Sequence, residues 1–193
     1  MLEKEWASIE DFATLFQYFW YRDFPIDQKS KGAHRVDWTI HIGVVVRNVA
    51  DLMGLVTRFE AGGRKDAVLR SADGDEVAIE WEWGGDWDKE LKKLKEHKKL
   101  WPKNKEGLKY AVLITYTDNI DNSHKRAEAE WKDARWPLLL ILIKVNEVPR
   151  KELTSRRKFE EIQMFQFDNN KPGELLRTIP ALPWNVRGTR WSY

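Results

Sequence analysis

The sequence predicts an α/β domain in which helices flank a mixed central β-sheet. Segments with apolar side chains at helical spacing alternate along the chain with segments rich in β-forming residues. In the second half, helices separate long apolar strands, an order typical of crossover connections around a sheet. With 193 residues, 42% of them hydrophobic and 33% charged, the chain is long enough for one well-buried core.

Two helices are predicted before the first strand. The first covers residues 8–21, with Ser8 as its N-cap. The second has Asp37 as its N-cap and Gly54 as its stop signal. Its expected buried stripe consists of Trp38, Ile42, Val45, Val49, Leu52 and Val56.

Strands and helices then follow in an order that suggests three parts. We expect a strand at 55–60, a hairpin at 64–83, helices at 86–101 and 121–136, buried strands at 109–117 and 138–145, and a strand at 159–167. The expected parts are an N-terminal helical extension (1–33), the α/β core (34–168) and an irregular C-terminal tail (169–193).

The hairpin carries acidic side chains at defined positions. Val77, Ile79, Trp81 and Trp83 alternate with Glu76, Ala78, Glu80 and Glu82, so Glu80 and Glu82 project from one face. A three-residue loop ending at Gly74 would pair Ser71 with Asp75 and place Asp66 opposite Glu80. A two-residue loop would instead turn Asp66 away from the glutamates.

Opposed carboxylates destabilise a strand pair unless something neutralises them. A divalent cation does so, because Mg²⁺ takes one or two carboxylates, keeps several waters and accepts phosphate oxygens. The alternative interpretation of the same pattern is a solvated polar face on an edge hairpin.

This order of elements, with an aspartate early in one strand and Glu-x-Glu near the end of the next, resembles the PD-(D/E)XK nuclease superfamily. The resemblance covers roughly residues 37–117. It implies a restriction-endonuclease-like core in which Asp66 and Glu80 ligate Mg²⁺ or Mn²⁺, with the Trp81 carbonyl as a further ligand. It also implies a catalytic set of Asp66, Glu80 and Glu82.

Glu82 departs from the family pattern, because most members have lysine at this position. A minority have glutamate there, acting as a base or as a ligand of a second metal. In other members the next helix supplies the lysine. Here that helix contains Lys92, Lys93, Lys95, Lys98 and Lys99, and Lys65 is another substitute. The family also uses an acid from the first helix or nearby, for which Asp51 and Glu60 are candidates.

The function that the resemblance implies is metal-dependent hydrolysis of nucleic acid, with DNA favoured over RNA. Lys92, Lys95 and Lys99 would contact backbone phosphates, although the same pattern suits a solvated helix face. The alternative is a catalytically inactive module of the same fold that binds nucleic acid or a protein. Glycoside hydrolysis is less favoured, because neighbouring glutamates on one strand do not flank a sugar.

Composition limits the remaining options. The net charge of +2 gives no strong global attraction to nucleic acid, and the absence of cysteine excludes disulfides and thiol chemistry. The four histidines show no metal-ligand spacing. The first residues do not resemble a signal peptide and the longest apolar run, 136–143, is too short to span a bilayer, so we expect a cytoplasmic protein without a membrane partner. A homodimer would be needed to cut both strands of a duplex at once.

Tryptophan is abundant, with eleven residues. Core packing is favoured over base stacking for those on predicted apolar faces, which are Trp38, Trp81, Trp83, Trp87 and Trp101. Trp184 and Trp191 belong to a stretch without periodicity, which would dock on the domain, on a second subunit or on nucleic acid.

Overall fold

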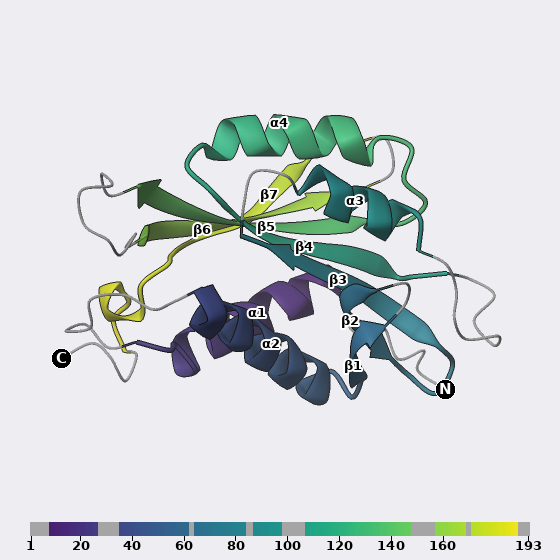
Figure 1. Ribbon diagram of the computed structural model, residues 1–193, viewed down its shortest axis with the longest axis horizontal. Coiled ribbons are helices and arrows are strands. Elements are labelled where there is room, and N and C mark those ends of the chain that lie inside the picture. Colours follow the sequence, from purple (N-terminus) through teal and green to yellow (C-terminus); the bar gives the residue numbers. More distant parts are fainter. Residues whose placement is uncertain are drawn as a thin grey trace.

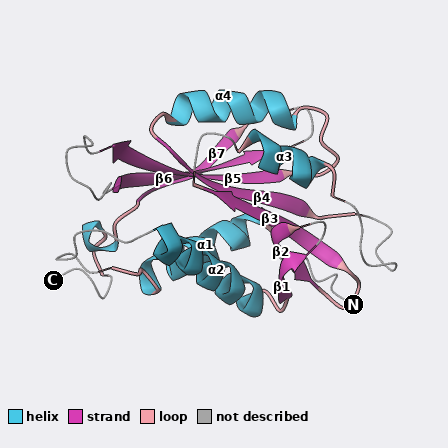
Figure 2. Ribbon diagram, in the orientation of Figure 1, coloured by secondary structure: helices cyan, strands magenta, loops and turns pink. Residues whose placement is uncertain are grey.

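The computed structural model describes residues 8–26, 35–61, 64–83, 87–97, 107–147, 157–168 and 171–188. They form a seven-stranded mixed sheet between two layers of helices (Figure 1 and Figure 2). The helices are α1 (Ile9–Arg22), α2 (Arg35–Leu52), α3 (Asp88–Lys95) and α4 (Ile120–Trp131). The strands are β1 (Val56–Ala61), β2 (Lys65–Arg70), β3 (Asp75–Glu82), β4 (Tyr110–Thr117), β5 (Leu138–Glu147), β6 (Arg157–Phe167) and β7 (Glu174–Pro180), followed by a 3₁₀ turn, η1 (Pro183–Asn185).

The strands lie in the sheet in chain order, from β1 at one edge to β7 at the other. β3, β4 and β5 are parallel to one another, and all other neighbours are antiparallel. Parallel neighbours need crossover connections, which α3 and α4 provide. These two helices cover one face of the sheet, and α1 and α2 cover the other (Figure 1). The predicted α/β class with a mixed sheet is therefore confirmed.

Two hydrophobic cores lie on the two sides of the sheet. The larger contains the buried faces of α1 and α2 with Val77 and Ile79 of β3 and with Trp83, which follows that strand. The smaller contains Leu91 and Leu94 of α3 with apolar residues of α4, β4 and β5. All eight residues of β4 are buried, as expected for a strand covered on both faces.

The ends of α1 and α2 follow the predicted signals in most respects. Ser8 caps α1, since its Oγ accepts a hydrogen bond from the Asp11 amide (3.1 Å) and the Asp11 carboxylate accepts one from the Ser8 amide. Gly54 follows α2 with a φ of 69°, a conformation that favours glycine. Asp37 lies in the first turn of α2, so its prediction as the N-cap is wrong.

The predicted buried stripe of α2 is wrong at its C-terminal end. Leu52 is 64% exposed and Val56, which belongs to β1, is 56% exposed. The buried positions there are instead Val46, Ala50 and Met53. The spacing of apolar residues in the sequence could not show which face of α2 is buried, because apolar side chains occur on both faces.

The prediction of an irregular C-terminal tail is wrong for β7, which pairs with β6 along the sheet edge. Side chains of α1 also hold the end of β7: the Trp20 indole donates to the Ala181 carbonyl (2.8 Å) and the Tyr21 hydroxyl to the Pro180 carbonyl (2.6 Å). Trp184 packs edge-on against Phe24, with ring centroids 5.7 Å apart. The segment therefore belongs to the domain.

The first helix shares a core with the sheet, since Phe12, Phe16 and Trp20 are fully buried in it. The predicted boundary after residue 33 lies outside the described residues. Trp38, Trp83 and Trp87 are buried as expected, Trp81 is partly buried, and Trp101 and Trp191 lie outside the described residues. None of the helices in the described ranges is long and apolar enough to cross a membrane.

Candidate metal centre

The β2–β3 hairpin brings Asp66 and Glu80 together. The strands pair from Leu69 with Val77 to Ala67 with Ile79, and the same register continued by one residue places Asp66 opposite Glu80. Two hydrogen bonds cross the strand pair here, one between Asp66 and Glu80 and one between Asp66 and Trp81. The Trp81 amide donates to Asp66 Oδ2 (2.8 Å), and the Asp66 amide donates to Glu80 Oε2 (3.3 Å). The predicted facing of these two carboxylates is confirmed.

The turn that sets this register differs from the prediction. Arg70, not Ser71, pairs with Asp75, and an irregularity between Leu69 and Arg70 restores the predicted register further along. Arg70 forms an ion pair with Asp75 (2.5 Å), and the Ser71 hydroxyl accepts a hydrogen bond from the Asp73 amide. These side-chain contacts tighten the turn around Ser71 and account for the shift.

Glu80 is the more deeply buried acid of the pair, because only 1% of its side chain is exposed. Its Oε1 accepts no hydrogen bond within the described part of the chain. The pKa of Glu80 is raised to about 9, mainly by burial and also by the charges of Asp66 and Glu90, while the charge of Lys93 opposes the shift. Burial also raises the pKa of Asp66. A cation close to both carboxylates would favour their ionised forms.

α3 supplies a lysine to this pair. Lys93 Nζ lies 3.8 Å from Glu80 Oε1 and 2.5 Å from Glu90 Oε2. Burial of the Lys93 ammonium works against its charged form, but the hydrogen bond to Glu90 and the charge of Glu80 prevail and raise the pKa of Lys93. Of the candidate lysines that the structure describes on this helix, Lys92, Lys93 and Lys95, it is therefore Lys93 that faces the carboxylate pair.

The other predicted lysines have different positions. Lys92 is exposed on α3. Lys95 donates to the carbonyls of Glu130 (2.7 Å) and Lys132 (2.8 Å) at the C-terminal end of α4, where a positive charge is favourable. Lys98 and Lys99 lie outside the described residues.

Glu82 lies near the end of β3, one strand repeat beyond Glu80. It is partly buried, and its Oε1 accepts a hydrogen bond from the Trp83 amide (2.6 Å). Its backbone carbonyl accepts one from the Thr115 hydroxyl (3.0 Å). The Glu82 carboxylate is thus held by the backbone amide that directly follows β3.

The two additional acids suggested by the resemblance do not complete the site. Asp51 is exposed on α2, which covers the opposite face of the sheet from α3 (Figure 1), so its candidacy is wrong. Glu60 lies beside Asp66 in the β1–β2 register, but it is exposed and has a φ of 51°. Within the described ranges, no three acidic or histidine side chains cluster as metal ligands.

A row of buried charges that the sequence did not reveal continues beneath α3. Lys65, at the start of β2, is 2% exposed; burial lowers its pKa, and the charges of Glu80 and Asp75 oppose that shift. His97 Nε2 lies 3.3 Å from Asp75 Oδ2, and burial lowers the pKa of His97. The carboxylate pair therefore lies at one end of a buried electrostatic network and not at an isolated point.

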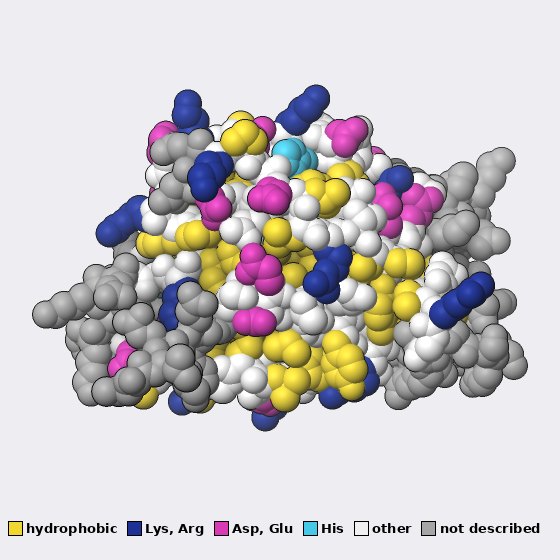
Figure 3. All heavy atoms as spheres, turned by 180° about the vertical axis from the view of Figure 1, so that it is seen from behind, with side chains coloured by type: hydrophobic (Ala, Val, Ile, Leu, Met, Phe, Trp, Pro, Cys, Tyr) yellow, Lys and Arg dark blue, Asp and Glu magenta, His cyan; other side chains and the backbone are white. Residues whose placement is uncertain are grey.

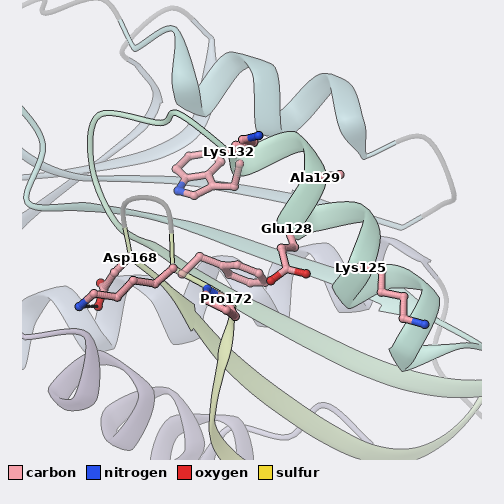
Figure 4. A pocket seen from close by; sticks show the side chains of 9 residues that line it. Lys125, Glu128, Ala129, Lys132, Asp168 and Pro172 are labelled. Atoms are coloured by element: carbon pink, nitrogen blue, oxygen red, sulfur yellow. Dashed lines mark ion pairs between the residues drawn. The ribbon is translucent and has the colours of Figure 1, made fainter.

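Away from this network, a pocket of about 380 Å³ lies between α4 and the turn that follows β6 (Figure 4). The indole of Trp131 and the ring of Phe167 form its apolar part, and three lysines and two acids surround it. Both acids are engaged, Glu128 with the Gly173 amide and Asp168 with Lys171. No metal-centre residue lines this pocket.

The face turned away in Figure 1 carries acidic and basic side chains intermingled with apolar ones (Figure 3). This mixture agrees with the small net charge. Comparisons of the chain with models of protein families, with curated proteins and with solved structures find no significant match.

Proposed function

We propose that this protein is a metal-dependent nuclease with a restriction-endonuclease-like core that hydrolyses phosphodiester bonds of nucleic acid, DNA favoured over RNA. The observation that carries the proposal is the Glu80 carboxyl group: it is buried, one oxygen accepts no hydrogen bond within the described residues, and Asp66 faces it across the strand pair. A buried carboxyl group with an oxygen that accepts no hydrogen bond lowers the stability of the fold unless it binds a ligand.

The residues of the site fit Mg²⁺ or Mn²⁺. Asp66 and Glu80 offer two hard oxygen ligands, the number that Mg²⁺ usually takes from a protein alongside water and phosphate oxygens. The Trp81 carbonyl is the further ligand that the family resemblance implies. When bound, the ion would polarise the phosphodiester and lower the pKa of the attacking water.

In this proposal, Lys93 takes the role that the motif lysine has in most of the family. Its ammonium lies 3.8 Å from Glu80 Oε1, where it can stabilise the negative charge that develops on a phosphate held at the pair. Glu90 holds that ammonium in place. Glu82 would assist the attacking water or a second ion, and Lys92 would contact backbone phosphates from the exposed side of α3.

The second candidate function is an inactive nuclease-fold module that binds nucleic acid or a protein partner. One observation favours it: the Glu82 carboxylate, at the position of the usual lysine, accepts a hydrogen bond from the adjacent Trp83 amide. Such a module would retain the fold without a metal affinity that depends on Asp66.

Cleavage assays on duplex DNA, single-stranded DNA and RNA, with Mg²⁺ or Mn²⁺, test the proposed function. We expect wild-type protein to cut at least one substrate and Asp66→Asn to lose about three orders of magnitude in rate. Asp73→Asn is the matched control, because Asp73 is exposed at the tip of the same hairpin. Metal binding without cleavage of any substrate would count against the nuclease, and the absence of metal binding that depends on Asp66 would favour the inactive module.

A further inference from the structure

We propose that a second copy of this chain binds to the outward face of α2, antiparallel about a two-fold axis. That face carries three apolar side chains at four-residue spacing: Val36 (60% exposed), Ile40 (60%) and Val44 (42%). α2 lies beside α1 in the helical layer on one face of the sheet (Figure 1), and its buried face packs in the larger core. Isolated exposed apolar residues are common, but a row of them on one helix marks an interaction surface.

The apolar row extends onto the sheet edge. Phe59 of β1 is 47% exposed, and a Cβ added to Gly43 of α2 would lie 3.9 Å from its ring. We call Val36, Ile40, Val44 and Phe59 the α2 patch. Because Gly43 has no side chain, the surface of α2 is shallow next to Phe59, and another helix can approach closely there.

The apolar and charged side chains on the outward face of α2 match those of the same helix in a second copy. In an antiparallel pair with the two-fold axis at the level of residue 42, positions equally far before and after 42 meet. Ile40 then packs against the partner's Val44, and Asp37 faces the partner's Arg47. The symmetry repeats both contacts, so an apolar centre is flanked by two opposite-charge pairs. This charge pattern favours a second copy over an unrelated partner.

The neighbouring strand edge is less suited to this association. β1 pairs with β2 through Phe59 and Ala61, but Glu60 between them has a left-handed φ of 51°. An irregularity of this kind bends an edge strand and disfavours pairing with another chain. The helix face therefore remains as the docking surface.

Disulfide trapping tests the arrangement, because the chain contains no cysteine and each introduced thiol is unique. We expect co-expressed Asp37→Cys and Arg47→Cys chains to form a covalent dimer on oxidation. Either variant alone should stay uncrosslinked, because identical positions would lie about 15 Å apart along the helix axis, beyond disulfide reach. Trapping of a single variant as efficiently as the mixture, or no trapping in the mixture, would overturn the arrangement.

Sedimentation measures the association without introduced thiols. Wild-type protein should dimerise at about 100 µM or below, and Ile40→Arg should weaken the dimer by at least about tenfold. Leu175→Arg is the control, because Leu175 is 50% exposed on β7 and outside the patch. A monomeric wild type, or an Ile40→Arg dimer as stable as the wild type, would refute the proposal. Neither result depends on nuclease activity.

Discussion

At the residue scale, Glu80 combines burial with an incomplete hydrogen-bond set. Only 1% of its side chain is exposed, and the charges of Asp66 and Glu90 both disfavour its ionised form. The folded pKa of about 9 exceeds the ordinary value of 4.5, so between these pH values the folded state binds more protons than the unfolded state. Stability contributed by this group is therefore lost as pH rises through that window.

Replacing Glu80 by glutamine should stabilise the metal-free protein. Glu80→Gln removes the ionisation, so its free energy of unfolding should exceed that of the wild type by about 2–3 kcal/mol at pH 7, with a smaller difference at pH 5 and a larger one at pH 9. Urea denaturation in chelator at the three pH values measures this difference. The exposed Glu174→Gln of β7 should change stability by less than about 0.5 kcal/mol. A destabilised Glu80→Gln would contradict this interpretation of the burial.

Strand alternation made it predictable that Asp66 and Glu80 can share a face, but the predicted pairing at the turn was wrong, and the irregularity between Leu69 and Arg70 restores the register. The roles of Lys93 and Lys65 were not predictable. Lys93 reaches Glu80 only because α3 packs over β3, and the burial of Lys65 depends on the same packing. The five candidate lysines between positions 92 and 99 have similar local sequence, so only tertiary placement distinguishes them.

At the element scale, α3 brings Lys93 and Glu90 to the carboxylate pair of the β2–β3 hairpin. Leu91 and Leu94 anchor it in the smaller core, and this orientation turns Lys93 and Glu90 toward Glu80. Lys95, two residues further, is directed to the C-terminal end of α4. On this short helix, Lys93 therefore faces the carboxylate pair, and Lys95 contributes to the contact between α3 and α4.

Lys93→Met should lower the kcat/KM for metal-dependent cleavage by about 10²-fold, because a positive charge at the developing phosphate charge is lost. Lys92→Met removes only an exposed phosphate contact, so it should lower kcat/KM by less than about threefold, through lost salt-dependent attraction. Equal losses in both variants would argue that α3 acts only as a basic surface.

At the scale of the whole molecule, the order of helices and strands from α1 to β6 was predictable, because each segment has a clear period or a long apolar run. β7 was missed because its strand alternation is weak; its pairing with β6 and the hydrogen bonds that Trp20 and Tyr21 donate at its end stabilise it. The solvent-facing apolar row of α2 was missed for a related reason. Sequence periodicity finds apolar faces, but it does not show which of them the monomer buries.

The central claim is that the folded chain builds a divalent cation site from Asp66 and Glu80, and calorimetric titration with Mn²⁺ tests it most directly. Wild-type protein and Asp73→Asn should bind Mn²⁺, with release of close to one proton per ion near pH 7.5, because burial keeps Glu80 protonated until the ion arrives. Asp66→Asn should bind at least about tenfold more weakly. Absence of Mn²⁺ binding by the wild type, or equal binding by Asp66→Asn, would contradict the claim.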